Sequence, residues 1–276
     1  MNLNNSFFAL TLLFISCQKQ LKENFDECTI YNLSQPTKVW KLPKQLKEIS
    51  GIVILNGQKA ICVNDEEGNL FIYDLNTKNI EQTIFFHKKG DYEDLAIKDS
   101  TAFVLRSDGT IFEVQNFMDS PKTVKHSTFL TKKDNAEGLF LDASKNQLLV
   151  ACKGNSETKN ESRFVYEFLL KNKRLNKNPF LTIQQKIVKA KYNFKKPFSP
   201  SGIAIHPISK NIYVLSSVGK MLAEFTSEGK LQKIYSLNYS HFQQPEGINF
   251  DEEGNFYISN EARKGKANIL KFNYLL

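Results

Sequence analysis

A short motif that recurs five times constrains the fold of this chain more than any other feature. Each copy, here called an opening motif, has a small or acidic residue at its centre and starts an alternating apolar run. The five copies are Glu48–Ile52, Asp91–Leu95, Asn135–Leu139, Ser199–Ile203 and Gln244–Ile248. The central residues, which we call the mouth residues, are Ser50, Glu93, Glu137, Ser201 and Glu246, with spacings of 43, 44, 64 and 45 residues. Such a period indicates one structural unit per repeat.

Each repeat predicts four short β-strands. In the first repeat, apolar runs at 52–55, 60–63, 70–74 and 82–86 are separated by turn residues such as Asn56-Gly57. A four-stranded antiparallel unit in every 40 to 50 residues is typical of a β-propeller blade. We therefore predict an all-β protein, a β-propeller with five blades. Six blades stay possible if the longest interval hides a degenerate blade.

The last repeat ends after three strands, at 248–250, 256–259 and 269–274. The alternating segment Thr37–Leu42 can supply the missing outer strand, which closes the ring and removes open sheet edges. The longest interval contains an insertion over 155–199. Its apolar residues at 183, 187, 188 and 192 have helical spacing, so we predict one short helix over 183–192. This helix either packs on the rim or binds a partner.

The N-terminus has the features of an export signal. Residues 1–16 carry no charged side chain, and the apolar run Phe7–Ile15 is too short to span a membrane. Ile15-Ser16-Cys17 resembles a bacterial lipobox, so we predict lipidation of Cys17 and anchoring to a membrane of the cell envelope, facing the periplasm. The alternative is an ordinary signal peptide cut elsewhere. The predicted organisation is a signal peptide 1–16, a lipidated tether 17–36 and a propeller domain 37–276.

Charge and cysteine content exclude some functional classes. The formal net charge is +8, but the lysines are scattered over turn positions and form no basic helix or basic-aromatic platform. We therefore expect no nucleic-acid partner. Cys28, Cys62 and Cys152 have neither metal-ligand spacing nor the number needed for a disulfide framework, and are interpreted as small buried hydrophobic residues.

Repeat phase predicts a polar ring at one end of the central channel. The start of each inner strand and the end of each second strand reach the same face of a propeller. We therefore predict a ligand-binding channel mouth formed by Ser50, Asn64, Asp65, Arg106, Lys153, Ser201, Ser216 and Asn260. The turns at the opposite face, such as 206–207, are interpreted as ordinary connections.

The remaining mouth residues, Glu93, Glu137 and Glu246, are predicted metal ligands. Three carboxylates at a narrow opening repel one another, which raises their pKa values unless a cation neutralises them. Calcium accepts such oxygen ligands and is the predicted ion. Two alternatives stay open: ion pairs with Arg106 and Lys153, and hydrogen bonds from backbone amides of neighbouring blades.

Signatures of catalysis are few. The sequence contains no G-x-S-x-G, H-E-x-x-H or glycine-rich phosphate loop. Of its four histidines, only His241 is expected on the side of the channel mouth. We predict a non-catalytic module that binds a small ligand or an envelope protein. The alternative is a calcium-dependent esterase or lactonase with His241 or a glutamate as the base.

The opening motifs, together with Tyr213–Ser217 and Tyr257–Glu261, resemble the SdiA-regulated family of bacterial propellers. The resemblance extends from Lys44 to Phe272. It implies an exported or membrane-attached propeller that is distantly related to calcium-dependent lactonases. It implies no settled activity, and the chain lacks the histidine pair on which such lactonases rely.

Overall fold

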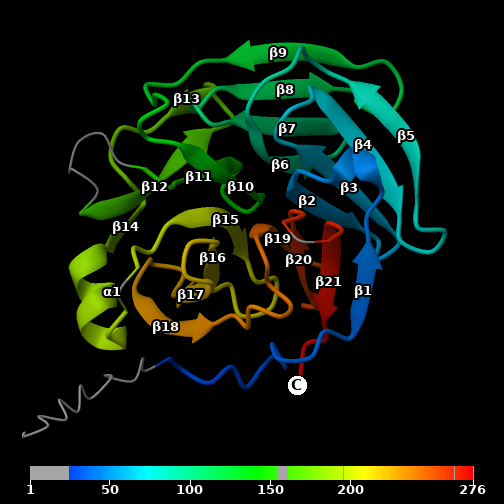
Figure 1. Cartoon of the computed structure of the whole chain (residues 1–276). Coiled ribbons are helices and arrows are strands. Elements are labelled where there is room, and N and C mark those ends of the chain that lie inside the picture. The colour runs from blue at the N-terminus through cyan, green and yellow to red at the C-terminus, as the bar shows by residue number, and fades with distance from the viewer. Residues whose placement is uncertain (1–24, 155–160, 195, 264, 276) are drawn as a thin grey trace, which may run out of the picture.

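Five antiparallel sheets surround a central axis in the computed structural model (Figure 1), which describes residues 25–154, 161–194, 196–263 and 265–275. Each sheet is one blade, and in blades 1, 2 and 4 the four strands run in sequence order from the centre outward. Blade 1 contains β2 (Ile49–Leu55), β3 (Lys59–Asn64), β4 (Asn69–Asp74) and β5 (Asn79–Phe85), and blade 2 contains β6 (Tyr92–Lys98), β7 (Thr101–Arg106), β8 (Ile111–Gln115) and β9 (Lys122–His126).

The other three blades follow the same plan. Blade 3 contains β10 (Ala136–Asp142), β11 (Gln147–Cys152), β12 (Ser162–Leu169), β13 (Arg174–Leu175) and β14 (Leu181–Gln184). Blade 4 contains β15 (Pro200–Ile205), β16 (Ile212–Ser216), β17 (Met221–Phe225) and β18 (Leu231–Ser236). Blade 5 contains β19 (Pro245–Phe250), β20 (Phe256–Asn260), β21 (Asn268–Phe272) and, as its outer strand, β1 (Lys38–Lys41). The prediction of a five-bladed propeller is confirmed.

The N-terminal strand closes the ring as predicted. β1 pairs antiparallel with β21, with Trp40 opposite Ile269. The short 3-10 helix η1 (Lys44–Leu46) then leads the chain into blade 1. Trp40 is buried, and its indole Nε1 donates to the carbonyl oxygen of Leu75 in blade 1 at 2.7 Å. This strand therefore fixes blade 5 to blade 1.

Apolar packing between neighbouring blades forms the core. One cluster of buried side chains lies at each blade interface among the described residues, for example Val104 and Phe112 with Ile61 and Ile72 between blades 1 and 2. The middle strands bury almost every residue because both of their faces meet another blade. Along the axis, apolar side chains narrow the channel to a cavity of about 140 Å³.

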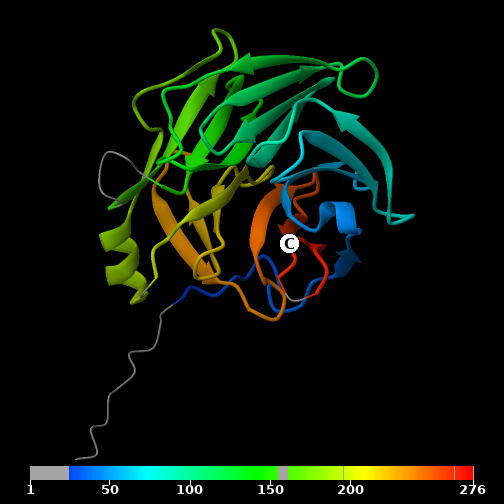
Figure 2. The same ribbon diagram turned by 45° about the horizontal axis from the view of Figure 1, so that its top comes forward.

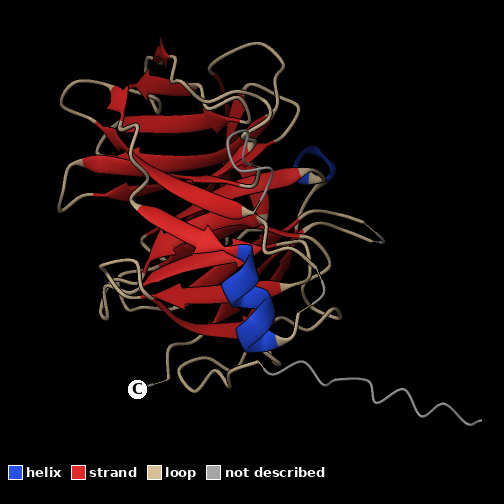
Figure 3. Ribbon diagram, turned by 90° about the vertical axis from the view of Figure 1, so that its left-hand side faces the viewer, coloured by secondary structure: helices blue, strands red, loops and turns tan. Residues whose placement is uncertain are grey.

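The segment predicted as an insertion, 155–199, contains both blade strands and added structure. β12, β13 and β14 belong to blade 3, and helix α1 (Gln185–Tyr192) follows them. The predicted helix is present, but its first two predicted residues belong to β14, where Ile183 pairs with Arg163. Val188 and Tyr192 pack into the core between blades 3 and 4, so the helix lies on the outer rim (Figure 3).

Residues 25–36 of the predicted tether contact blades 4 and 5 (Figures 1 and 2). The Asp26 carboxylate accepts hydrogen bonds from the Tyr192 hydroxyl at 2.7 Å and from the Ile234 backbone N–H at 2.9 Å. Tyr31 is buried and donates to the Gly254 carbonyl oxygen at 2.6 Å. The predicted signal peptide 1–16 and Cys17 lie outside the described residues. Within the described part of the chain, no helix is long and apolar enough to span a membrane.

Candidate functional site at the channel mouth

Each inner strand carries a β-bulge at its mouth residue. In blade 2, Tyr92 pairs with Arg106 and Asp94 pairs with Leu105, so Glu93 has no residue opposite it. Glu137 is skipped in the same way between Ala136 and Gly138. The register shifts at the same place in the other three blades, where the skipped stretches include Ser50, Ser201 and Glu246. Since a bulge redirects the side chain that it adds, five equivalent side chains are redirected at one end of the channel.

The inner strands approach one another so closely at this end that the next residue is usually glycine. A Cβ atom on Gly51 would lie 2.7 Å from the Cα of Asp94, and one on Gly202 would lie 2.6 Å from the Glu246 carbonyl oxygen. At Gly247 the corresponding distance is 2.6 Å to the Ser50 carbonyl oxygen, which connects blade 5 to blade 1. The mouth residues therefore lie where the backbones of neighbouring inner strands pack tightly against one another around the channel.

Three glutamates and one lysine meet at this mouth. The Lys153 ammonium lies 3.0 Å from Glu137 Oε1, which also accepts a hydrogen bond from Asn135 Nδ2 at 2.5 Å. Burial tends to lower the pKa of Lys153, but the charges of Glu137, Glu246 and Glu93 outweigh it and raise that pKa. An ion pair of Lys153 with one of the three glutamates, Glu137, is thus observed.

One ammonium does not neutralise these carboxyls. Burial and the Glu137 charge hold the pKa of Glu93 well above its usual range. Burial and the same charge raise the pKa of Glu246 to about 7. Burial also raises the pKa of Glu137, although Lys153 opposes that shift. Full ionisation of the three carboxyls therefore needs more positive charge than Lys153 supplies.

Two further charged residues at the mouth were missed by the sequence reasoning. Asp91 adds to the raised pKa values of Glu93 and Glu137, and its carboxylate accepts a hydrogen bond from Ser107. Lys220 is 4% exposed; burial lowers its pKa to about 8, while the Glu246 charge opposes the shift. Asp91 opens the same motif as Glu93, which was an available signal. Lys220 lies in the turn beyond the second strand of blade 4, where no periodicity points to it.

Arg106 does not join the glutamates. Its guanidinium binds Asp108 in the following turn, with Nε 3.0 Å from Oδ1 and Nη2 2.7 Å from Oδ2. This hydrogen-bonded ion pair lowers the pKa of Asp108 to about 2 despite the burial of that carboxyl. The expected ion pair of Arg106 with the glutamates is therefore wrong, because its guanidinium is paired with Asp108.

Asn64 ends β3 of blade 1 and is followed by Asp65, and Asn260 ends β20 of blade 5, all at the same end of the propeller as the mouth residues. Asn64 donates to the Gln45 carbonyl oxygen at 3.0 Å, and Asn260 donates to Asn268 Oδ1 at 3.0 Å. Burial, together with the charges of neighbouring carboxylates, raises the pKa of Asp65 to about 6. These side chains extend the acidic character of the mouth towards blade 1.

Of the predicted serines, Ser201 and Ser216 connect backbone segments through their hydroxyls, and Ser50 takes part through its backbone carbonyl oxygen. Ser201 Oγ donates to the Pro245 carbonyl oxygen at 3.0 Å, across blades 4 and 5. Ser259 Oγ donates to the Ser50 carbonyl oxygen at 2.8 Å, across blades 5 and 1. Ser216 Oγ donates to the Val218 carbonyl oxygen at 2.9 Å within its turn. Bonding between blades, left open for the glutamates, is thus observed for Ser201.

The arrangement was tested for a metal ion. In residues 25–154, 161–194, 196–263 and 265–275, no three His, Cys, Asp or Glu side chains gather closely enough to hold one. The Lys153 ammonium already contacts Glu137. Calcium would therefore have to displace Lys153 and draw the three carboxylates closer together, and calcium binding by Glu93, Glu137 and Glu246 stays a prediction.

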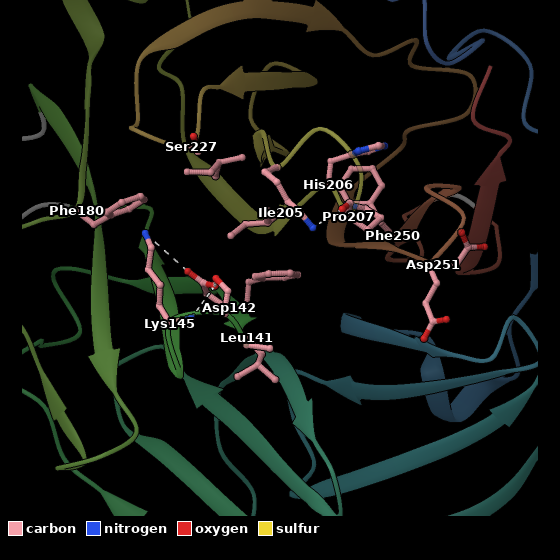
Figure 4. A pocket seen from close by; sticks show the side chains of 16 residues that line it. Leu141, Asp142, Lys145, Phe180, Ile205, His206, Pro207, Ser227, Phe250 and Asp251 are labelled. Atoms are coloured by element: carbon pink, nitrogen blue, oxygen red, sulfur yellow. Dashed lines mark hydrogen bonds and ion pairs between the residues drawn. The ribbon is translucent and has the colours of Figure 1, made fainter. Parts of the chain in front are cut away.

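The opposite face is also hollowed, contrary to its interpretation as ordinary connections. A pocket of about 450 Å³ opens between the ends of β10 and β15, and the turn that contains His206 and Pro207 forms part of its wall (Figure 4). This pocket depends on how blades 3, 4 and 5 pack together. The hydrophobic pattern of an individual β-strand therefore could not predict this pocket.

Comparison with known proteins supports the same fold. A crystal structure of Myxococcus xanthus glutaminyl cyclase matches with a TM-score of 0.57 and 12% identity, covering 87% of this chain and 95% of that one. A luciferin-regenerating enzyme matches with a TM-score of 0.54 and 10% identity, covering 87% and 96%. At these identities the likeness establishes the propeller fold alone.

Sequence comparison identifies the family. No curated protein matches the sequence. The model of the SdiA-regulated family matches residues 91–263, which include four of the five opening motifs. That match extends over more than half of the chain and agrees with the resemblance noted in the motifs. The chain belongs to the SdiA-regulated family.

Proposed function

We propose that this protein is a non-catalytic binding module that takes a small, positively charged ligand at its channel mouth. The supporting observation is that Glu93, Glu137 and Glu246, from three blades, are buried close enough together to raise one another's pKa values. Lys153 contacts Glu137 directly and Lys220 acts on Glu246 only through its charge. Keeping several carboxyls buried and partly protonated is costly to the fold. Groups whose pKa values are strongly shifted by burial and by specific charge partners cluster at functional sites. A cationic ligand at this mouth would let the glutamates ionise.

Calcium is the simplest ligand of this class. It accepts carboxylate, carbonyl and amide oxygens in variable geometry, and the mouth offers the three glutamates and Asn135. A cation among them replaces the Lys153 contact with Glu137 and allows the glutamates to ionise together. An organic ammonium group satisfies the same charge deficit with hydrogen bonds alone.

A melting experiment tests this proposal. Calcium should raise the melting temperature of the wild-type protein, because a ligand that binds only the folded state stabilises it. The triple variant Glu93→Gln, Glu137→Gln and Glu246→Gln should lose that rise, whereas Glu81→Gln, at an exposed ion pair on β5, should keep it. Wild-type melting that ignores calcium and chelator alike would remove calcium from the proposal.

We further propose that the protein is anchored to the cell envelope through a lipid on Cys17. Seven residues separate Cys17 from Phe25, where the described chain begins, so the two are at most about 30 Å apart. Because residues 25–36 run beside blade 4 and α1, such an anchor holds the outer rim near the bilayer.

Metabolic labelling with radioactive palmitate tests the anchor. The wild-type protein should incorporate label, and Cys17→Ala should abolish it. Cys28→Ala is the matched control and should label normally, since Cys28 is partly buried against the propeller. An unlabelled wild-type protein would refute lipidation and leave the binding proposal untouched.

A hydrolase is the second candidate. The pKa of Glu246, near 7, suits a general acid or base at neutral pH. A panel of chromogenic esters and lactones, assayed with and without calcium, separates the two functions. Turnover that disappears in Glu246→Gln supports the hydrolase, and no turnover across the panel supports the binding module.

A further inference from the structure

The pocket on the face opposite the mouth has an apolar lining that is held in place by the core. Phe140, Phe180 and Ile205 pack against the cluster between blades 3 and 4, and Phe250 packs against the cluster between blades 4 and 5. One side of each of these side chains is thus fixed, and all four line the pocket. Figure 4 shows Phe180, Ile205 and Phe250 at its wall. Its volume of about 450 Å³ lies in the range of small-molecule sites, which are mostly apolar with few polar groups.

Two of the acidic groups that border this pocket are engaged in their own turns. The Asp142 carboxylate accepts hydrogen bonds from Ser144 Oγ at 2.6 Å and from the Lys145 backbone N–H at 3.3 Å. The Asp251 carboxylate accepts from the Asn255 backbone N–H at 2.8 Å and from the Tyr257 hydroxyl at 2.9 Å. The third acid, Glu252, is exposed. Both oxygens of Asp251 are therefore engaged, whereas Asp142 uses Oδ1 in its turn and leaves Oδ2 beside Lys145.

Two lysines also border the pocket, and they differ in their hydrogen-bonding capacity. Lys210 Nζ donates to the Pro207 carbonyl oxygen at 2.5 Å. Lys145 Nζ lies 5.1 Å from the centre of the Phe180 ring, and its nearest carboxylate oxygen, Asp142 Oδ2, is 3.9 Å away, too far for a hydrogen bond (Figure 4). An ammonium has three N–H donors, and this long contact leaves most of them available. The Lys145 ammonium can therefore donate hydrogen bonds to a ligand that lies on the apolar surface of the pocket.

We propose that this pocket binds a small apolar anion, such as an aromatic or alkyl carboxylate or sulfonate. Its apolar body packs on Phe140, Phe180 and Phe250, and its anionic group is held by Lys145. The site is separate from the channel mouth because it lies at the C-terminal ends of the inner strands, whereas the bulges lie at their N-terminal ends. The proposal is thus independent of cation binding.

Fluorescence titration of the full chain tests the site with two probes. Anilinonaphthalene sulfonate is apolar and anionic, and N-phenylnaphthylamine is similar in shape but neutral. Both should bind once per chain with enhanced fluorescence. Lys145→Gln should weaken binding of the sulfonate about tenfold, as expected for a charge-assisted hydrogen bond, and leave the neutral probe unchanged. Lys41→Gln, on β1, is the matched control and should alter neither.

A second variant blocks the pocket without touching the core. Ser227 lies in an exposed turn at the pocket edge, so Ser227→Trp can fill the space while the protein keeps its melting temperature. Binding of both probes should then be lost. The proposal is overturned if Ser227→Trp leaves both affinities intact. It is equally overturned if Lys145→Gln weakens the two probes alike or not at all.

Discussion

Asp94 occupies the position that glycine holds in the other four opening motifs. Its side chain is 2% exposed, with Oδ1 accepting from the Leu95 N–H at 2.8 Å and Oδ2 accepting from the Leu139 N–H at 2.7 Å. The second bond joins blade 2 to blade 3. Burial raises the pKa of this carboxyl well above its usual range, although both N–H groups oppose the shift. A single residue thus replaces close backbone contact with a side-chain bridge.

Removing that bridge should destabilise the ring. Asp94→Ala leaves the Leu139 N–H buried without its acceptor, and we expect the free energy of unfolding to fall by about 2 kcal/mol. Urea denaturation measures the loss. Asp119→Ala, at an exposed turn, is the control, and an equal loss in both variants would contradict a bridging role for Asp94.

The Glu246 carboxyl links stability to pH. Its pKa is about 7 in the folded protein, against 4.5 for an unperturbed glutamate, so the folded state binds more protons between these values. The stability contributed by this group is complete below pH 4.5 and is lost as the pH rises through 7. From pH 5 to 8 the wild-type protein should lose about 2 kcal/mol more than Glu246→Gln. Parallel pH profiles of the two proteins, from urea denaturation, would refute this assignment.

At the scale of the element, the inner strand shows what the sequence could predict. The repeat predicted that the five mouth residues occupy equivalent positions in the five blades. The strand register shows a bulge at each of these positions. The helix prediction extended two residues into β14 because Ile183 has helical spacing but pairs with Arg163 across the sheet. Residues 25–36 have no periodic pattern, so their packing through Tyr31 was not foreseeable. The position of Lys220 at the mouth and the pocket on the opposite face could not be predicted, because they depend on turn geometry and on contacts between blades.

Glycine in an inner strand should resist substitution. A Cβ on Gly247 would lie 2.5 Å from Ser259 Oγ and 2.6 Å from the Ser50 carbonyl oxygen. Gly247→Ala should therefore lower the free energy of unfolding by about 2 kcal/mol, as overpacking does. Gly57→Asn is the control: its φ of 63° suits asparagine and nothing lies within 4 Å. Equal stability of the two variants in urea would contradict the close approach of the strands.

The whole molecule is a ring whose two ends differ in chemistry. Charged side chains gather where the inner strands begin, and an apolar pocket opens where they end. The channel between them is narrowed to a cavity of about 140 Å³ with a mostly apolar lining. Each end can therefore hold its own ligand, provided that the ring stays closed.

Closure depends on Trp40. Trp40→Ala removes a buried indole and its hydrogen bond to the Leu75 carbonyl oxygen, so we expect a loss of about 4 kcal/mol and a lower melting temperature. Val39→Ala alters the same strand at a side chain that is 45% exposed and should have little effect. Equal melting temperatures of Trp40→Ala and Val39→Ala would show that the Trp40 indole does not hold the ring closed.

The charge deficit at the mouth is tested most directly by a crystal structure of the protein grown with calcium. We predict an ion about 2.3 to 2.6 Å from carboxylate oxygens of Glu93, Glu137 and Glu246, the usual range for calcium, with the Lys153 ammonium displaced from Glu137. A mouth without an ion, in which Lys153 still contacts Glu137 while calcium saturates the solution, would contradict calcium binding by the three glutamates.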